Sequence, residues 1–207
     1  MNFNNNRIKD LDRLYRINLI NSITGPKSAN LIATISSNKV RNLAIFSSVV
    51  HLGSDPALIG FFVRPVKNAI RDTYSNIIDT RLYTINHINS SIINESHMTS
   101  GKFPSDISEF EKCKLNEVYL NNFKVPFVKE SYIKFGMELH EINDIKSNNS
   151  KLIIGSIKEI VIDKNYVDSD GTIDLEKSNS VSVGGVNTYY VLNKVKKLPY
   201  IGSKINF

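Results

Sequence analysis

Residues 29–65 read ANLIATISSNKVRNLAIFSSVVHLGSDPALIGFFVRP, and this stretch decides the fold. It contains three short apolar runs, at 29–36, 42–50 and 57–63, separated by turn-forming residues such as Gly53-Ser54-Asp55-Pro56. The first run alternates apolar and polar side chains, with Ile32 as the exception. Short runs of this kind, bounded by turn signals, are typical of β-strands. We therefore predict three successive strands here.

The spacing of the apolar residues then changes to that of a helix. Ile70, Tyr74, Ile77 and Ile78 recur at helical spacing, and Pro65 suits a first helical turn. Further along we predict short helices at 90–100 and 105–112, each with a serine cap, and strands at 81–86, 132–140, 151–163 and about 182–192. Many strands with few short helices favour a closed or nearly closed β-barrel over a parallel α/β sheet. The predicted fold class is mainly β.

Length and composition indicate one globular domain. With 207 residues the chain can bury one substantial core, and we divide it into an N-terminal segment, 1–15, and a single domain, 16–207. Cys113 is the only cysteine, which excludes an intrachain disulfide. The first residues lack the apolar core of a signal peptide, and no apolar run approaches 18 residues. We expect a cytoplasmic protein without a membrane span.

The formal net charge of +6 raises the alternative of a nucleic-acid partner. However, the basic residues are scattered, and only Tyr132 and Lys134 place an aromatic and a basic side chain on one face of a predicted strand. A modest positive charge would equally help to recruit a phosphorylated small molecule. We keep a nucleic-acid-binding β-barrel as an alternative and predict no nucleic-acid partner.

The sequence lacks the common catalytic motifs. It has no Gly-x-Ser-x-Gly elbow, P-loop or His-Glu-x-x-His, and no Gly-x-Gly-x-x-Gly follows a strand, which argues against a Rossmann domain. The four histidines, His51, His87, His97 and His140, lack the spacing of metal ligands. We therefore predict no metal site.

Polar residues between Asn42 and Thr80 form a candidate anion site. Arg64 ends a predicted strand just before a helix, on which Thr73, Asn76 and Thr80 are spaced by three and four and share one stripe. An arginine, a helix N-terminus and a line of hydroxyl and amide groups suit a phosphate. The residues alone leave an alternative open, in which Thr80 bonds its own backbone and Ser47-Ser48 starts a turn.

The same stretch resembles the flavin reductase-like family of FMN-binding split β-barrels. Members carry Asn-x-Ala/Thr, Ser-Ser and Asp-Pro-Pro in this order, and here we find Asn42-Leu-Ala44, Ser47-Ser48 and Asp55-Pro56. The resemblance covers roughly residues 16–200, and its further matches are Arg64-Pro65, Asp72-Thr73, Asn76-Ile77, Thr80, Tyr83–Asn86, His97–Ser100, Ser108–Phe110, Gly184-Gly185, Tyr189-Tyr190 and Leu198–Tyr200.

The resemblance implies a Greek-key split β-barrel, related to pyridoxamine 5'-phosphate oxidase-like flavoproteins, that binds FMN. The implied phosphate contacts are Arg64, Thr73 and Asn76, with Thr80 on the same stripe. Asn42, Ala44, Ser47 and Ser48 would line the isoalloxazine and ribityl chain, with His97 and Ser100 on the open face. The resemblance also implies a homodimer with the flavin at the subunit boundary, to which Tyr189 or Tyr190 would contribute.

The implied activity is that of an NAD(P)H-dependent flavin oxidoreductase, of the kind that serves a monooxygenase partner, with NADH or NADPH as electron donor. Two positions depart from the family pattern. Ala57 replaces a second proline, and Ser147-Asn-Asn-Ser150 replaces a Gly-Asp-His turn on the nicotinamide side of the flavin. The second departure keeps an alternative open, in which the protein is a flavin-binding carrier or sensor without reductase activity.

Overall fold

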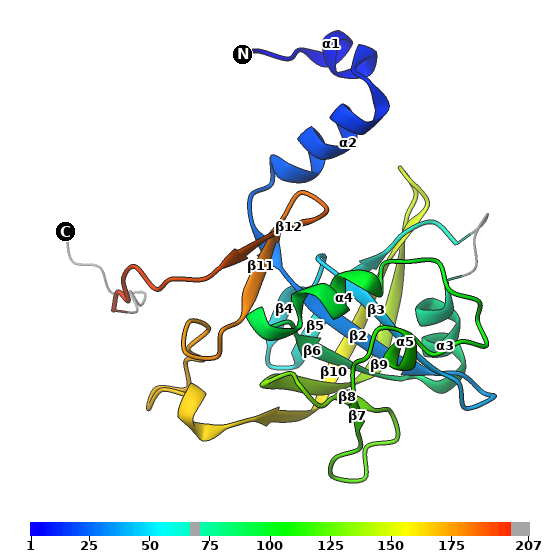
Figure 1. The fold of residues 1–207 in the computed structure, drawn as a ribbon, viewed down its shortest axis with the longest axis vertical. Coiled ribbons are helices and arrows are strands. Elements are labelled where there is room, and N and C mark those ends of the chain that lie inside the picture. Colours follow the sequence, from blue (N-terminus) through cyan, green and yellow to red (C-terminus); the bar gives the residue numbers. More distant parts are fainter. Residues whose placement is uncertain (67–70, 200–207) are drawn as a thin grey trace.

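Seven antiparallel strands form one strongly curved sheet in the computed structural model, which describes residues 1–66 and 71–199 (Figure 1). The strand order is β3-β2-β6-β9-β10-β5-β4. The strands are β2 (Asn30–Ile35), β3 (Arg41–Phe46), β4 (Val50–Ser54), β5 (Ala57–Val63), β6 (Leu82–His87), β9 (Ile133–Ile145) and β10 (Ser150–Ile162). The two edge strands, β3 and β4, are joined by the short segment 47–49, so the two edges of the sheet lie close together. The sheet therefore curls into a barrel that is split between β3 and β4. The predicted mainly β split barrel is confirmed.

Strand β2 is buried on both faces, which explains why Ile32 broke the alternation. Leu31 and Ala33 pack into a core on the outside of the barrel, whereas Ile32 packs into the barrel interior. A strand covered on both faces reads as a nearly continuous apolar run. Strand β2, the first strand of the stretch 29–65, therefore contributes side chains to both cores of the protein.

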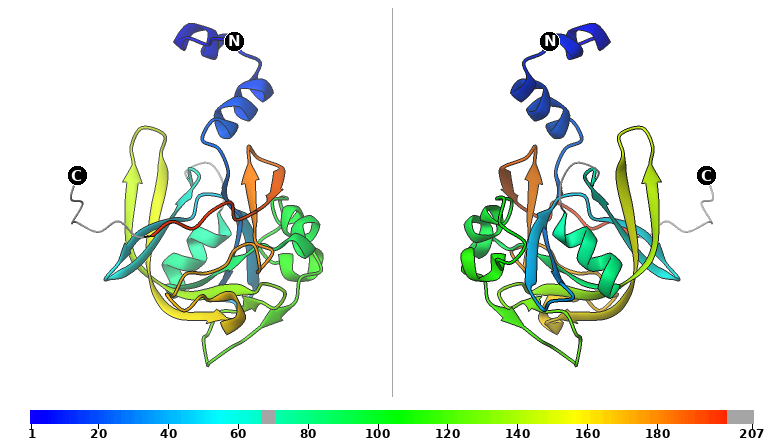
Figure 2. Two further views of the ribbon diagram at one scale, coloured as in Figure 1. Left: turned by 90° about the vertical axis from the view of Figure 1, so that its left-hand side faces the viewer. Right: turned by 90° about the vertical axis from the view of Figure 1, so that its right-hand side faces the viewer.

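Helices cover the outside of β2 and β3 and close one end of the barrel (Figures 1 and 2). On the outside lie η1 (Ser90–Ile92), α4 (Ile93–Met98) and α5 (Glu109–Lys112), together with the short hairpin of β7 (Glu117–Val118) and β8 (Phe127–Val128). Helix α3 (Asp72–Thr80) packs against β2 and β3 and inserts Ile77 into the interior core. The barrel is thus plugged at its α3 end.

The N-terminal helices project away from the barrel (Figures 1 and 2). They are α1 (Asn5–Asp10) and α2 (Arg13–Ser22), and the predicted boundary between residues 15 and 16 falls within α2. The chain then enters a small sheet of order β1-β11-β12, formed by β1 (Lys27–Ser28), β11 (Val181–Gly184) and β12 (Thr188–Val191). Between β10 and β11 lie η2 (Lys164–Tyr166) and a long loop.

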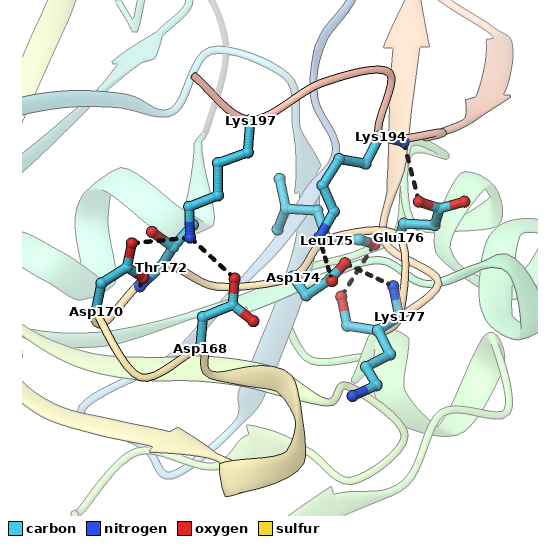
Figure 3. A network of polar contacts seen from close by, with 10 residues as sticks. Asp168, Asp170, Thr172, Asp174, Leu175, Glu176, Lys177, Lys194 and Lys197 are labelled. Carbon is cyan, nitrogen blue, oxygen red and sulfur yellow. Dashed lines mark hydrogen bonds and ion pairs between the residues drawn. The ribbon is translucent and has the colours of Figure 1, made fainter. Parts of the chain in front are cut away.

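Lysines of the C-terminal segment, residues 192–199, bind acidic side chains of that loop (Figure 3). The Lys197 ammonium lies 2.8 Å from an Asp170 carboxylate oxygen and 3.1 Å from one of Asp168. The Lys194 ammonium lies 2.5 Å from Asp174 Oδ2. These contacts hold the end of the described chain against the loop that follows η2.

Several predicted elements differ in their bounds. The strand predicted at 182–192 is a hairpin, because Gly185 with a φ of +62° turns the chain so that β12 pairs back on β11. The run at 42–50 is broken into β3 and β4 at Ser48. The Ser48 hydroxyl accepts from the Phe62 N–H on β5 and donates to the Phe62 carbonyl.

The helices also differ from their predicted bounds. Helix α3 begins at Asp72 and not at Pro65, because the Arg71 backbone, with φ −130° and ψ 86°, is not helical. The helix predicted at 105–112 is only α5, and Asn89, not a serine, caps η1. Ile70, Tyr200 and the predicted domain end at residue 207 lie outside the described residues. Within residues 1–66 and 71–199, none of the helices is long and apolar enough to span a bilayer.

Candidate functional site

A buried hydrogen-bond network ties α3 to the barrel. The Asn42 side-chain amide on β3 donates to the hydroxyls of Thr34 and Thr73, at 3.1 Å each, and the Asn76 amide donates to the same Thr34 oxygen at 3.0 Å. All four side chains are buried. Because unpaired buried amides are costly, this network fixes the position of α3 against β2 and β3. The structure therefore brings together three of the predicted site residues.

The N-terminus of α3 presents groups that suit an anion. Its N-cap residue, Arg71, makes no side-chain capping bond, so the first N–H groups of the helix are not satisfied by a cap. The Arg71 Nε is buried without a partner among the described residues, and Arg64 lies exposed after the end of β5. Asp72, in the first turn, carries one negative charge that repels an anion. The two guanidinium groups carry two positive charges. Thr73 Oγ1 accepts from Asn42, which leaves its O–H to donate elsewhere.

Two other predicted residues, Thr80 and Ser48, bond backbone groups. The Thr80 hydroxyl donates to the carbonyl of Asn76, one turn earlier, at 2.7 Å, as in the alternative reading of this residue. The Ser48 hydroxyl is engaged with the Phe62 backbone. Ala44 and Ser47 are half-buried, Ala44 within β3 and Ser47 just after it. Their binding roles stay predictions.

His97 and Ser100 lie apart from the α3 network, at and just after the end of α4. His97 Nδ1 lies 3.0 Å from the Tyr189 hydroxyl on β12, and the two rings meet edge to face. The Ser100 hydroxyl donates to the His97 carbonyl. Burial raises the pKa of Tyr189. The His97–Tyr189 contact thus joins α4 to the hairpin of β11 and β12. From the sequence, both residues were predicted only as flavin contacts.

The barrel end opposite α3 opens into an apolar cavity of about 310 Å³, which we call the barrel mouth. Its lining comes mostly from isoleucines and valines, and the polar exceptions are Ser28, Asn30, His51 and His87. Burial lowers the pKa of His87 to about 4, so its ring is neutral at pH 7. Asn30 Oδ1 is buried without a hydrogen-bond partner among the described residues.

Other polar residues have structural roles. Lys134, which with Tyr132 was the hint of a nucleic-acid face, is buried and donates to the carbonyls of Val128 and Lys129, so it is not available to a phosphate backbone. In the part of the chain that the structure describes, no group of three or more His, Cys, Asp or Glu side chains could hold a metal ion.

Sequence reasoning missed three residues of this region. Thr34 is the shared acceptor of the buried amides, and only its pairing opposite Asn42 across β2 and β3 reveals it. Arg71 could have been found from its position directly before Asp72-Thr73. Glu109 on α5 accepts a hydrogen bond from the Leu43 N–H on the outer edge of β3, and burial raises its pKa. No sequence pattern signals that long-range contact.

Comparisons with known proteins show the family and the fold of this chain. A family model described as "Flavin reductase like domain" matches residues 26–175. An uncharacterized protein of Methanothermobacter thermautotrophicus is 30% identical over 158 residues, which cover 74% of this chain and 72% of that one.

Two solved structures share the fold over nearly their whole length. The crystal structure of a candidate flavin reductase with a split barrel domain, from Shewanella frigidimarina, is 42% identical and superimposes with a TM-score of 0.92, covering 97% of this chain and 100% of that chain. Nitrilotriacetate monooxygenase component B from Bacillus cereus, at 21% identity, covers 96% and 98% with a TM-score of 0.82, and this likeness concerns the fold alone. The chain belongs to the flavin reductase-like domain family of split β-barrels, a family whose function concerns flavin.

Proposed function

We propose that this protein binds FMN with the phosphate at the N-terminus of α3. The observation that carries the proposal is the uncapped start of α3, which directly follows Arg71 and holds Thr73 in its first turn, and Arg64 precedes it in the chain. Helix N–H groups and guanidinium groups are the usual ligands of a phosphate. The two arginines outweigh the single charge of Asp72. In this proposal Asn42, Asn76 and Thr80 act indirectly, because they hold Thr73 and the helix in place.

The isoalloxazine would lie along the free edge of β3. The Leu43 N–H points away from β2 to Glu109, so by alternation the N–H and C=O of Ile45 also point away from the sheet. Such groups fit the polar edge of a flavin ring. Ala44 on β3, with Ser47 and Ser48 just after it, continues this edge, and His97 on α4 and Ser100 just after it are the proposed contacts on the open face.

The proposed activity is reduction of flavin by NADH or NADPH. Bound FMN would supply the hydride-accepting chemistry, and the protein would supply position, electrostatics and solvent exclusion. The arginines hold the phosphate, the buried Thr34 network keeps α3 rigid, and α4 shields the ring from water. By analogy with component B of nitrilotriacetate monooxygenase, the reduced flavin would serve a separate monooxygenase.

A carrier function is the second candidate, favoured by the turn between β9 and β10. There Asn148 Oδ1 accepts from both the N–H and the hydroxyl of Ser150, at 3.0 and 2.6 Å, so these polar groups bond each other. Anaerobic mixing of the flavin-loaded protein with NADH and with NADPH separates the two functions. Bleaching of the flavin absorbance supports a reductase, whereas flavin that stays oxidised with both nucleotides supports a carrier.

Flavin binding itself is tested by substitution of the two arginines. We expect Arg64→Ala and Arg71→Ala each to weaken FMN binding by about 1.5–3 kcal/mol, the range for a lost charged hydrogen bond, or roughly tenfold to a hundredfold in Kd. Quenching of FMN fluorescence in a titration measures the affinity. Lys164→Ala, in η2, is the control and should leave the affinity unchanged. Equal affinities in all four proteins would remove the phosphate from this helix end.

A further inference from the structure

Two polar side chains lie next to each other in the wall of the barrel mouth. Asn30 on β2 and His87 on β6 are directly opposite each other in the antiparallel pairing of these strands. Because side chains alternate along a strand, Asn30 shares a face with Ile32, and His87 shares a face with Ile85. Both isoleucines belong to the interior core, and both polar residues line the cavity. Asn30 and His87, which we call the polar pair, therefore face the inside of the barrel side by side.

The Asn30 amide keeps one acceptor free. Its Nδ2 donates to the Ser28 hydroxyl oxygen at 3.0 Å, and this hydroxyl donates to the Val49 carbonyl at 3.2 Å. The two bonds fix which end of the amide carries the donor, since the Ser28 hydroxyl has given its own hydrogen to Val49. Asn30 Oδ1 is left without a partner among the described residues, although Asn30 is only 1% exposed. A buried acceptor of this kind calls for a donor from outside the chain.

His87 adds an uncharged donor and an acceptor to this acceptor. Its ring is neutral at pH 7 because burial lowers its pKa to about 4, and a neutral imidazole has one N–H and one acceptor nitrogen. The ring meets the Phe135 ring edge to face, with centroids 6.3 Å apart, a contact between rings that satisfies neither nitrogen. The polar pair can therefore serve a group that both donates and accepts a hydrogen bond, which is the property of a hydroxyl.

The remaining wall of the cavity is apolar and carries no fixed charge. Apart from Ser28, Asn30 and the two histidines, valine, isoleucine and phenylalanine side chains line it, and none of the described lining residues is Lys, Arg, Asp or Glu. Val50 and Ile160 belong to this lining and are 40% and 59% exposed, so the cavity is open to solvent. Such a wall suits an uncharged apolar body, because an ion would lose its hydration there without gaining a partner.

The volume of the cavity limits the size of its occupant. A cavity of about 150 Å³ holds one benzene molecule, so the 310 Å³ of the barrel mouth has room for one or two rings. Water is a poor occupant of most of this space, since an ordered water needs about two to four polar partners and only the polar pair supplies them at the inner wall.

We propose that the barrel mouth binds a small, uncharged ring compound that carries a hydroxyl group, such as a phenol or a naphthol. The hydroxyl donates to Asn30 Oδ1 and accepts from the His87 ring, while the rings pack on the valines and isoleucines of the wall. This site lies at the end of the barrel opposite α3 and is separate from the proposed phosphate site. The inference does not depend on flavin binding.

Calorimetric titration with 2-naphthol at pH 7 tests the proposed ligand class. We expect one 2-naphthol to bind per chain, with the same affinity in the absence and in the presence of saturating FMN. Asn30→Leu keeps the size of the side chain and removes the acceptor, so it should weaken binding about tenfold, the effect of one lost hydrogen bond. 2-Naphthoate has the same rings but a charged carboxylate, and it should bind at least as weakly to the wild-type protein as 2-naphthol binds to Asn30→Leu.

A second variant tests the position of the ligand. Ile160→Trp fills the cavity from its exposed side and should abolish 2-naphthol binding. Ile78→Trp on α3, at the other end of the barrel, is the control, because Ile78 is also well exposed, at 44%, and its substitution should leave binding unchanged. Circular dichroism verifies that each variant folds.

Four results overturn the proposal. The first is a wild-type protein without saturable 2-naphthol binding, as expected of a mouth that other protein closes. The second is displacement of 2-naphthol by FMN, which would place the rings in a flavin site. The third is undiminished binding in folded Asn30→Leu or Ile160→Trp, and the fourth is equal affinity for 2-naphthol and 2-naphthoate.

Discussion

Glu109 is a buried carboxyl whose role is to cover the edge of the barrel. Its Oε2 accepts the Leu43 N–H at 2.9 Å, on the side of β3 that no other strand pairs within the described chain. Nearby, Arg41 pairs with Glu111 and Glu117, so that acidic residues of α5 and β7 line this edge. Burial, and to a lesser extent the charge of Asp72, raises the pKa of Glu109 above its ordinary value. The ionised side chain thus destabilises the fold even as it provides a needed acceptor.

We predict that Glu109→Gln is at least as stable as the wild-type protein at pH 7, whereas Glu109→Ala loses about 1–3 kcal/mol by leaving the Leu43 N–H unpaired. The raised pKa means that the folded protein holds its proton more tightly than the unfolded chain. The wild-type stability therefore falls as the pH rises from the ordinary glutamate pKa through the folded one. Glu109→Gln should lack this decrease. Urea unfolding between pH 4 and pH 8 measures it, and identical pH profiles would contradict the assignment.

At the residue scale, sequence reasoning found polar side chains but not their partners. Thr73 and Asn76 could be placed on one stripe because helical spacing is a local property. That Asn42 bonds both Thr34 and Thr73 depends on the pairing of β2 with β3 and on the docking of α3, which are long-range contacts. For the same reason Glu109, 66 residues from its partner, gave no signal.

At the scale of elements, β9 and β10 form the longest pairing of the barrel, and a glycine allows it to bend. The register shifts between Ile154 and Gly155. A Cβ built on Gly155 would lie 2.1 Å from the Tyr83 hydroxyl oxygen. That hydroxyl is buried without a hydrogen-bond partner among the described residues, and burial raises the pKa of Tyr83. The Tyr83 ring therefore occupies the space that a side chain at position 155 would need.

We predict that Gly155→Ala destabilises the protein by about 1–3 kcal/mol, the usual cost of overpacking a core. Tyr83→Phe alone should be close to neutral, because the deleted hydroxyl has no partner to lose. In the double variant the phenylalanine ring leaves more room for the new methyl group, so part of the loss should be recovered. A thermodynamic cycle from urea unfolding of the four proteins measures this coupling. Additive effects would show that the two residues do not compete for the same space.

The spacing of apolar residues predicted most of the strands and helices, because this spacing depends only on neighbours in the sequence. The run at 57–63 became β5 with the predicted bounds, and 151–163 differs from β10 by one residue at each end. The hairpin of β11 and β12 was read as one strand, since β-branched and aromatic residues continue on both sides of Gly185. Helices α1 and α2 were not predicted, and the apolar residues of α2 are spread around the helix without the one-sided pattern that signals an amphipathic helix.

For the whole molecule, the two ends of the chain are held in different ways. Helices α1 and α2 bury no residue, whereas the C-terminal segment is anchored by Lys194 and Lys197 (Figure 3). The Lys197 ammonium lowers the pKa of Asp170, and the Lys194 ammonium lowers that of Asp174. The Lys194 N–H also donates to Glu176 at 3.0 Å. Four acidic residues of one loop thus receive two lysines.

We predict that the double variant Lys194→Ala, Lys197→Ala releases this segment without changing the stability of the barrel. Both lysines are more than two-fifths exposed, and exposed ion pairs contribute little to global stability because water and salt screen them. The urea midpoint should therefore stay unchanged, whereas the Lys194 backbone amide, which donates to Glu176, should lose its protection from hydrogen exchange. High salt should have the same effect on the wild-type segment.

Because paired aspartates with a lowered pKa stay charged until the pH falls through that pKa, the segment should stay bound at neutral pH and be released in acid. If the midpoint dropped together with protection, residues 192–199 would be part of the cooperative fold.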